Sequence, residues 1–359
     1  MSFSHDDSLI VRTWYEIAAH AIEARASDIH VEVSRTEMVV RIRVDGSLTV
    51  FSHYPLEIHE RLITRIKILA RLDIAEKRLP QDGHLSIGLD FANPNIDCRV
   101  SVLPTLYGEK AVIRILPNRI EELALEKIGL LPDQLAVMER ALQEPNGLIL
   151  VTGPTGSGKT RTLYSCLNTL NQSHRNLCSI EDPVEIRLPG INQVAYHPRA
   201  GLDFPVIIKA LLRQDPDVIM IGEIRDKATA ELAIQAAQTG HLVLSTLHTR
   251  NARGVLPRLK SLGVDQEALE SSLRCVSSQR LVPMLCKTCK DWPHQDRFSC
   301  SVCNGNGYLG RIGIHEILTI EQLLDPDIPF KDIAKAGLSR LEEGIIDRIA
   351  FEAEVGAWH

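Results

Sequence analysis

The chain has 359 residues, of which 44% are apolar and 24% charged, an ordinary globular composition with room for two domains. The formal net charge of −6 argues against bulk nucleic-acid binding as the main role. No apolar run reaches the roughly 18–20 residues of a membrane span, and the polar start lacks the apolar core of a signal peptide. We therefore expect a cytoplasmic protein that meets a membrane only through partners.

The first part of the chain, residues 1–117, predicts a small α+β domain. Apolar residues recur at helical spacing in residues 8–26 and in about 57–72. A turn is expected at Asp45-Gly46. Alternating apolar and polar residues predict strands at 28–33, 38–44, 83–89, 96–103 and 110–116.

Residues 118–140 are expected to form a linker with helical ends, followed by an α/β domain at 141–359. Strand and helix patterns alternate there, as in a parallel sheet covered by helices. From about residue 316 to the end we expect short helices. The predicted strands are 148–152, 177–180, 218–221 and 241–247, and the predicted helices are 159–170, 205–212 and 227–239.

A glycine-rich segment joins the first of these strands to its helix. It reads Gly153-Pro154-Thr155-Gly156-Ser157-Gly158-Lys159-Thr160, the full G-x-x-x-x-G-K-T pattern. Glycines let the backbone curl around a polyphosphate, and the N–H groups of the loop and of the following helix form an anion site. Lys159 is expected to reach the β- and γ-phosphates, and the Thr160 hydroxyl to ligate magnesium. The segment predicts a phosphate-binding loop.

Two further strands end in carboxylates that suit nucleotide hydrolysis. The strand 218–221 is followed by Gly222-Glu223, where a Walker B strand usually ends in Asp-Glu. We expect Glu223 to be the general base that activates water. Glu181, after the strand 177–180, is expected to support the metal or the water, with Asp182 a weaker candidate, because parallel strands end at one edge of the sheet. The alternative is a solvated turn before Pro183.

Two histidines flank the predicted strand 241–247. His248, at its carboxyl end, is a candidate for contact with the γ-phosphate. Packing is the alternative role for His248, and it applies equally to His241.

Four of the eight cysteines form two C-x-x-C pairs separated by ten residues, within a segment at 284–311. Four thiolates at this spacing predict a tetrahedral zinc site without an open position, and hence a structural role; a redox pair is the alternative. The remaining cysteines, Cys98, Cys166, Cys178 and Cys275, are expected to be buried thiols. The predicted zinc ligands are Cys286, Cys289, Cys300 and Cys303.

Taken together, these motifs resemble the secretion ATPase superfamily that powers type II secretion and type IV pilus assembly (the GspE/PilB group). The resemblance covers about residues 24–318. In the second domain it rests on the phosphate loop and on residues 179–185, 212–217, 222–226, 239–241, 246–249 and 279–282. In the first domain it rests on residues 26–30, 41–46, 79–83 and 98–101.

The resemblance implies a RecA-like ATPase domain preceded by a PAS-like α+β domain, assembled as a homo-hexamer that uses ATP and Mg²⁺. It implies that arginines of the first domain complete the ATP site, and the matching positions are Arg43, Arg99 and Arg114. Without the resemblance, ion pairs on the sheet face would be the simpler role for these arginines. The implied partner is a polytopic inner-membrane platform protein of the GspF/PilC type. The short sequence before the first motifs leads us to expect a form without the family's additional N-terminal domain.

The main hypothesis is therefore a motor that assembles pilus or pseudopilus subunits. A retraction motor of the same fold is the first alternative, although retraction members generally lack the two cysteine pairs. Gly222 raises a second alternative, a scaffold that binds ATP without hydrolysing it. Nucleic-acid translocation is disfavoured by the net charge of −6 and by the absence of a basic stripe in the sequence.

Overall fold

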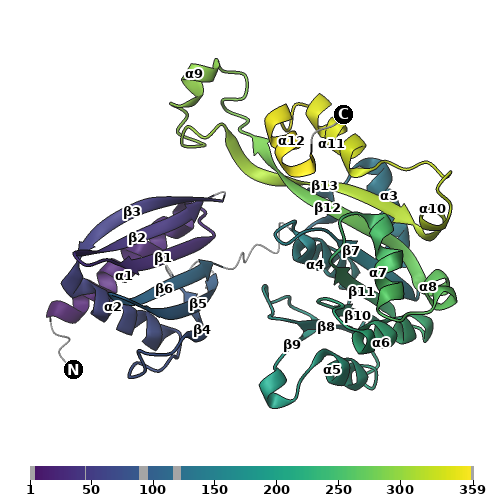
Figure 1. Cartoon of the computed structure of the whole chain (residues 1–359), viewed down its shortest axis with the longest axis horizontal. Coiled ribbons are helices and arrows are strands. Elements are labelled where there is room, and N and C mark those ends of the chain that lie inside the picture. The colour runs from purple at the N-terminus through teal and green to yellow at the C-terminus, as the bar shows by residue number, and fades with distance from the viewer. Residues whose placement is uncertain (1–4, 45, 89–95, 116–122, 357–359) are drawn as a thin grey trace. The chain divides into compact units, whose positions relative to one another are not determined.

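The computed structural model describes residues 5–44, 46–88, 96–115 and 123–356 (Figure 1). The predicted turn residue Asp45 and the start of the predicted linker, residues 118–122, lie outside the described residues. The chain divides into two compact units, Met1–Asn118 and Arg119–His359. Each unit has its own hydrophobic core.

The first unit is a six-stranded antiparallel sheet with two helices. The strand order is β3-β2-β1-β6-β5-β4. The strand β3 was not predicted, because its alternation is irregular and it lies at the edge of the sheet, where few of its side chains are buried. The elements are α1 (His5–Glu23), β1 (Asp28–Val33), β2 (Glu37–Val44), β3 (Ser47–Pro55), α2 (Leu56–Leu69), β4 (Gln81–Ile87), β5 (Ile96–Thr105) and β6 (Gly108–Ile115).

The helices α1 and α2 cover one face of this sheet. Ile29 and Val31 of β1 lie in one core cluster with Trp14 of α1 and Leu62 of α2. Because successive strand residues point to opposite faces, Asp28 and its neighbours on the other strands belong to the face that the two helices leave open. That open face carries the arginines singled out by the sequence.

The second unit contains a seven-stranded sheet in the order β13-β12-β7-β11-β10-β8-β9. Six strands are parallel, and β13 alone runs antiparallel to its neighbour β12. The strands are β7 (Gly147–Thr152), β8 (Leu177–Glu181), β9 (Ile191–Ala195), β10 (Val218–Ile221), β11 (Leu242–Leu247), β12 (Leu273–Leu285) and β13 (Tyr308–Thr319). The predicted α/β fold is confirmed.

Helices cover both faces of the central strands, which are apolar on both sides. Leu148 and Leu150 of β7 pack in the cluster of α5 to α8, whereas Ile149 and Val151 pack in that of α3 and α4. The helices are α3 (Pro132–Gln143), α4 (Lys159–Leu170), α5 (Phe204–Leu211), α6 (Lys227–Gln238), α7 (Val255–Ser261) and α8 (Gln266–Ser272). Among the described helices, none combines the length and the apolar character of a membrane crossing.

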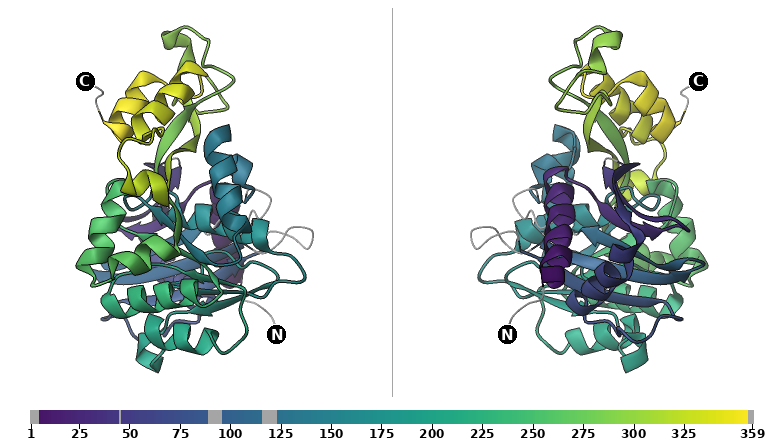
Figure 2. Two further views of the ribbon diagram at one scale, coloured as in Figure 1. Left: turned by 90° about the vertical axis from the view of Figure 1, so that its right-hand side faces the viewer. Right: turned by 90° about the vertical axis from the view of Figure 1, so that its left-hand side faces the viewer.

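The structure differs from the prediction in the chain segment before β7 and in the segment that follows the last predicted strand. The described part of the predicted linker buries Leu123, Leu125 and Met138 in the core of the second unit, so it is a packed part of that unit. Residues 316–319 continue β13 before the helical end begins. That end consists of α10 (Ile320–Leu324), α11 (Ile333–Glu342) and α12 (Arg348–Val355), the last two packed beside the long β12–β13 hairpin (Figure 2).

Candidate active site

The phosphate loop joins β7 to α4, as the sequence predicts. Gly153, Gly156 and Gly158 have φ angles of 142°, 80° and 87°, which favour glycine. A Cβ at Gly153 would lie 2.5 Å from the carbonyl oxygen of Gln279, so a larger residue would displace the backbone there. The loop therefore has the conformation that a backbone phosphate cradle requires.

Gln279 supports the loop from the neighbouring strand β12. Its side-chain Nε2 donates to the carbonyl of Ser157 at 2.6 Å, and its Oε1 accepts from the Thr162 hydroxyl at 2.8 Å. Gln279 is itself buried. No motif in the sequence assigns Gln279 a role, although three consecutive polar residues, Ser277 to Gln279, inside a buried strand point to polar partners there.

Lys159 is held inside the loop. Its ammonium donates to the carbonyls of Gly153 and Pro154, at 3.0 and 2.9 Å. Burial lowers the pKa of Lys159, and the nearby carboxylate of Glu223 opposes that shift. The cation thus lies between the loop and the carboxylate at the end of β10.

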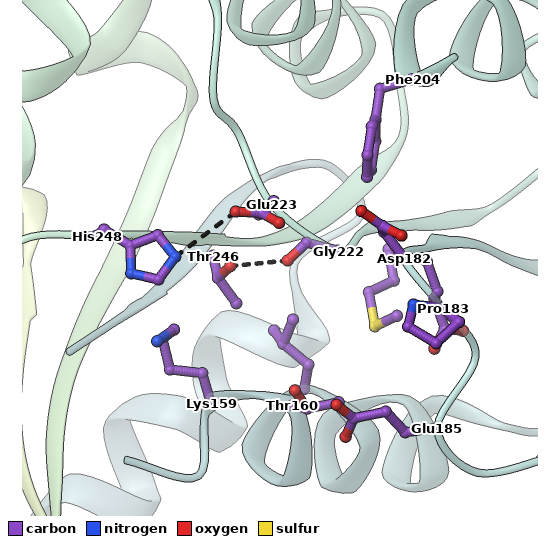
Figure 3. A pocket seen from close by; sticks show the side chains of 13 residues that line it. Lys159, Thr160, Asp182, Pro183, Glu185, Phe204, Gly222, Glu223, Thr246 and His248 are labelled. Atoms are coloured by element: carbon purple, nitrogen blue, oxygen red, sulfur yellow. Dashed lines mark hydrogen bonds and ion pairs between the residues drawn. The ribbon is translucent and has the colours of Figure 1, made fainter. Parts of the chain in front are cut away.

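A cavity of about 200 Å³ opens beside the loop. Its walls come from the carboxyl ends of the parallel strands and from the start of α4, which is where ligands bind in open α/β sheets. Phe204 and Thr246 also line it (Figure 3), as does Met220, and no sequence motif singles these three residues out. Six of the candidate site residues line this one cavity, namely Lys159, Thr160, Glu181, Asp182, Glu223 and His248.

Glu223 lies between two basic side chains. His248 Nε2 is 3.5 Å from one carboxylate oxygen of Glu223 (Figure 3). Arg225 forms an ion pair with the other carboxylate oxygen. The Arg225 guanidinium also lies 3.7 Å from Asp182, and its hydrogen bond with Glu223 raises the pKa of Arg225. No role for Arg225 was expected from the sequence. These contacts hold the Glu223 carboxylate at the edge of the cavity.

Gly222 lies close to the neighbouring strand β8. Its N–H donates to the carbonyl of Ile180 at 2.8 Å, and a Cβ would lie only 3.0 Å from that same oxygen. Its own carbonyl accepts from the Thr246 hydroxyl at 2.7 Å. The close approach of β10 to β8 leaves little room for the aspartate that a Walker B strand usually carries here.

Glu181, expected to support the metal or the water, is hydrogen-bonded within the protein. It is 2% exposed, and its carboxylate accepts from Tyr164, from Ser179 at 2.5 Å and from Gln193 at 3.0 Å. Both of its oxygens are therefore occupied by donors of the protein. Asp182 and Glu185, which follow it, line the same cavity as Thr160.

The two histidines have different surroundings. The His248 side chain is 54% exposed and faces Glu223, so it is accessible to a ligand in the cavity. His241 Nδ1 lies 3.0 Å from the carbonyl of Ala236 near the end of α6. That contact corresponds to the packing role considered for His241.

The three arginines carried over from the resemblance lie in one row across the first unit's open sheet face. Asp28 is paired in register with both Arg43 and Arg114, and Arg114 with Arg99. Arg114 Nε lies 2.9 Å from the Asp28 carboxylate and Arg43 Nε 3.9 Å. Two of the three therefore make the sheet-face ion pairs that are the simpler role for them. The row still holds three cations against one carboxylate.

The four paired cysteines come from the segment that joins β12 to β13 and contains α9 (His294–Arg297). Figure 1 shows α9 beyond the end of the β12–β13 hairpin. Their sulfur atoms all lie within 4.8 Å of one another, and all four residues are buried. A tetrahedral Zn–S₄ site with bonds of about 2.3 Å spaces its sulfurs by about 3.8 Å. Cys289 and Cys303 are 3.6 Å apart, and the Gly307 N–H donates to the Cys303 sulfur. The donor set fits zinc.

We expect freshly purified protein to contain one zinc ion per chain, held by this single cysteine cluster. Cys286→Ser should lose most of the metal and loosen residues 284–311, because three thiolates bind zinc far more weakly than four. Elemental analysis and limited proteolysis would measure both effects. Cys98→Ser, which alters a buried cysteine of the first unit, should keep its zinc; metal-free wild-type protein would refute the site.

Comparisons with known proteins place the chain in a family. The profile of the family described as type II/IV secretion system protein matches residues 4–332. The chain is 47% identical over 323 residues to type II secretion system protein HxcR of Pseudomonas aeruginosa, covering 89% of this chain and 68% of that protein. It is 40% identical to the type IV pilus assembly ATPase PilB of Acinetobacter baylyi, covering 95% and 65%. The chain thus spans about two thirds of the length of these relatives.

Solved structures show the same fold. The Legionella pneumophila ATPase DotB superposes with a TM-score of 0.72 at 21% identity, covering 94% of this chain and 93% of that one. The pilus retraction motor PilT with bound ADP gives a TM-score of 0.68 at 26% identity, covering 94% and 96%. At these identities the likeness concerns the fold.

Proposed function

Because this chain belongs to the type II/IV secretion system protein family, we propose that it is the hexameric motor that assembles a type IV pilus or a type II secretion pseudopilus. The chain is an ATPase of this family. The observation that carries the proposal is the single cavity in which the phosphate-loop residues Lys159 and Thr160 meet Glu223 and His248. That cavity joins a phosphate cradle to a carboxylate able to accept a proton.

In the proposed reaction, the loop N–H groups and Lys159 hold the β- and γ-phosphates. Thr160 would ligate Mg²⁺, which supplies positive charge to the phosphates when bound. Glu223 orients a water molecule and accepts its proton as the water oxygen attacks the γ-phosphorus and the bond to ADP breaks. His248 lies beside Glu223 and faces the same cavity, so we assign it contact with the γ-phosphate.

We further propose that the arginine row of the first unit, Arg43, Arg114 and Arg99, completes an ATP site in the hexamer. The support is the composition of the row, in which three guanidinium groups lie beside one carboxylate. Such groups stabilise the charge that develops on a transferring phosphoryl group. Supplying them from a separate unit couples hydrolysis to movement between the units.

The proposed partner is a polytopic inner-membrane platform protein of the GspF/PilC type, which would hold the motor on the cytoplasmic side of that membrane. Assembly is favoured over retraction by the cysteine cluster, since retraction members generally lack it, and by relatives named for type II secretion and pilus assembly. The scaffold alternative is weakened by Glu223, which lies at the cavity with a basic group on each side.

The arginine proposal predicts that Arg43→Ala binds ATP and forms rings as the wild type does, yet hydrolyses ATP about 10²- to 10³-fold more slowly. ATP affinity would be measured by fluorescence titration, ring formation by analytical ultracentrifugation, and turnover by phosphate release. Arg12→Ala is the matched control, because Arg12 lies exposed on α1, which covers the opposite face of the sheet.

The results of this test distinguish the role of Arg43 from the existence of a shared ATP site. A normal rate in assembled Arg43→Ala rings would remove Arg43 from the site and turn the test to Arg99 and Arg114. Wild-type turnover per chain that stays the same when rings dissociate would contradict a shared site altogether.

A further inference from the structure

Tyr164, in the middle of α4, is among the largest fully buried side chains of the protein. Its ring contributes to the core, but its hydroxyl meets Glu181 and two backbone N–H groups of the segment that follows β8. We propose that Tyr164 is a positioning residue, which fixes the acidic segment 182–186 relative to Thr160 and so sets the geometry of the magnesium side of the site. This inference rests on the proposed ATPase site.

The Tyr164 hydroxyl uses all of its hydrogen-bonding groups, one donor and two acceptor lone pairs. Tyr164 donates its hydrogen to Oε2 of Glu181, since an ionised carboxylate can only accept. Its oxygen accepts from the N–H groups of Glu185 and Ile186, at 3.0 and 3.3 Å. The hydroxyl thus connects the buried charge of Glu181 to the backbone of the acidic segment.

Glu181 forms the fixed end of this connection. It lies at the end of β8, and its other oxygen accepts from Ser179 and Gln193. Gln193, on the neighbouring strand β9, also donates to the Ile186 carbonyl at 3.0 Å and accepts from the Leu188 N–H at 2.8 Å. The acidic segment is therefore held to the sheet through Gln193 and to α4 through Tyr164.

The position of Tyr164 on α4 relates these hydrogen bonds to the expected magnesium ligand Thr160. Tyr164 follows Thr160 by four residues, so the two side chains lie on the same face of the helix, one turn apart. Asp182 and Glu185, which lie within the held segment, line the cavity together with Thr160. Losing the hydroxyl would therefore change the spacing between the Thr160 hydroxyl and these carboxylates.

Glu181 receives a different role from the one its sequence position suggested. The Glu181 oxygens accept three hydrogen bonds from protein donors, which leaves at most one of about four lone-pair sites for another ligand. We assign it the charge that orders the Tyr164 hydroxyl. Glu181 and Tyr164 should then act as one unit, and substitutions at the two positions should be strongly non-additive.

The test is Tyr164→Phe in the full chain, which keeps the buried ring and removes only the hydroxyl. We expect hydrogen exchange at residues 183–188 to become several-fold faster and the Mg²⁺ concentration for half-maximal turnover to rise about tenfold. Turnover itself should fall about 10- to 100-fold, as for other misplaced active-site groups. Nucleotide affinity without Mg²⁺ should change less than about twofold, because the phosphate loop is untouched.

Tyr308→Phe is the matched control. Tyr308 donates to the Asp347 carboxylate at 2.7 Å, so the control removes the same kind of hydrogen bond beside the C-terminal helices, away from the cavity. It should lower stability without altering the Mg²⁺ dependence. An equal change in Mg²⁺ dependence in both variants would overturn the proposal.

Two further outcomes separate this inference from the proposed function. In the double variant Tyr164→Phe/Glu181→Gln, turnover should be close to that of the worse single variant; additive losses would overturn the shared role. Hydrogen exchange at 183–188 reports the network whether or not the protein hydrolyses ATP. Unchanged exchange in Tyr164→Phe would therefore overturn the positioning role, even with the ATPase site intact.

Discussion

Lys159→Ala is expected to lower ATP hydrolysis to below about 1% of the wild-type rate, because the substitution removes the cation that holds the β- and γ-phosphates. In the structure the Lys159 ammonium donates to two carbonyls of its own loop and lies in the field of Glu223. The loop glycines keep their conformation without it, so the variant should fold. Phosphate release would measure the loss of hydrolysis, and ATP titration would measure the weaker binding of ATP.

Lys227→Ala is the matched control, since Lys227 also opens a helix of the second unit but is exposed and paired with Glu231. It should retain wild-type turnover. If Lys159→Ala hydrolysed ATP normally, the contacts of Lys159 with the Gly153 and Pro154 carbonyls would be its whole role, and the assignment of residues 153–160 as the nucleotide cradle would be wrong.

Sequence patterns predicted the elements whose formation depends on residues close to one another in the chain. The phosphate loop and β10 were predicted because their glycines and apolar run act through the adjacent backbone and core. The strand β12 was not, because Ser277, Ser278 and Gln279 interrupt its apolar pattern. Gln279 is acceptable there only because its amide pairs with Ser157 and Thr162, more than a hundred residues away in sequence.

The role of Glu181 depends on long-range contacts in the same way. Its sequence position at the end of a parallel strand suggests a ligand of the metal, and it does line the cavity. Its actual partners are donors from α4 and β9, which no local pattern of the sequence identifies. The Gly222 position is similar, because the Ile180 carbonyl that crowds it belongs to another strand.

These contacts leave Glu223 as the carboxylate with the clearest access to an attacking water. It is partly exposed, at 18%, and it reaches the cavity between Arg225 and His248, whereas Glu181 is enclosed. The ion pair with Arg225 also limits how far the carboxylate can turn. An amide at position 223 would keep the size of the side chain but lose its capacity to accept a proton.

Glu223→Gln is therefore expected to bind ATP with near wild-type affinity and to hydrolyse it about 10²- to 10⁴-fold more slowly, as for the loss of a general base. Single-turnover phosphate release would isolate the chemical step from product release. The control is Glu231→Gln, an exposed carboxylate on α6 that pairs only with Lys227 among the described contacts.

Retained activity in Glu223→Gln would move the base to another carboxylate of the cavity. Glu181 could then act only by giving up its bond to Tyr164, so Glu181→Gln would have to stop hydrolysis while Tyr164→Phe left Mg²⁺ dependence unchanged. With Glu223 as the base, Glu223→Gln should be the slowest of these variants, and Tyr164→Phe, about 10- to 100-fold slower than the wild type, should lose further activity at low Mg²⁺. The order of the three rates therefore decides which carboxylate accepts the proton.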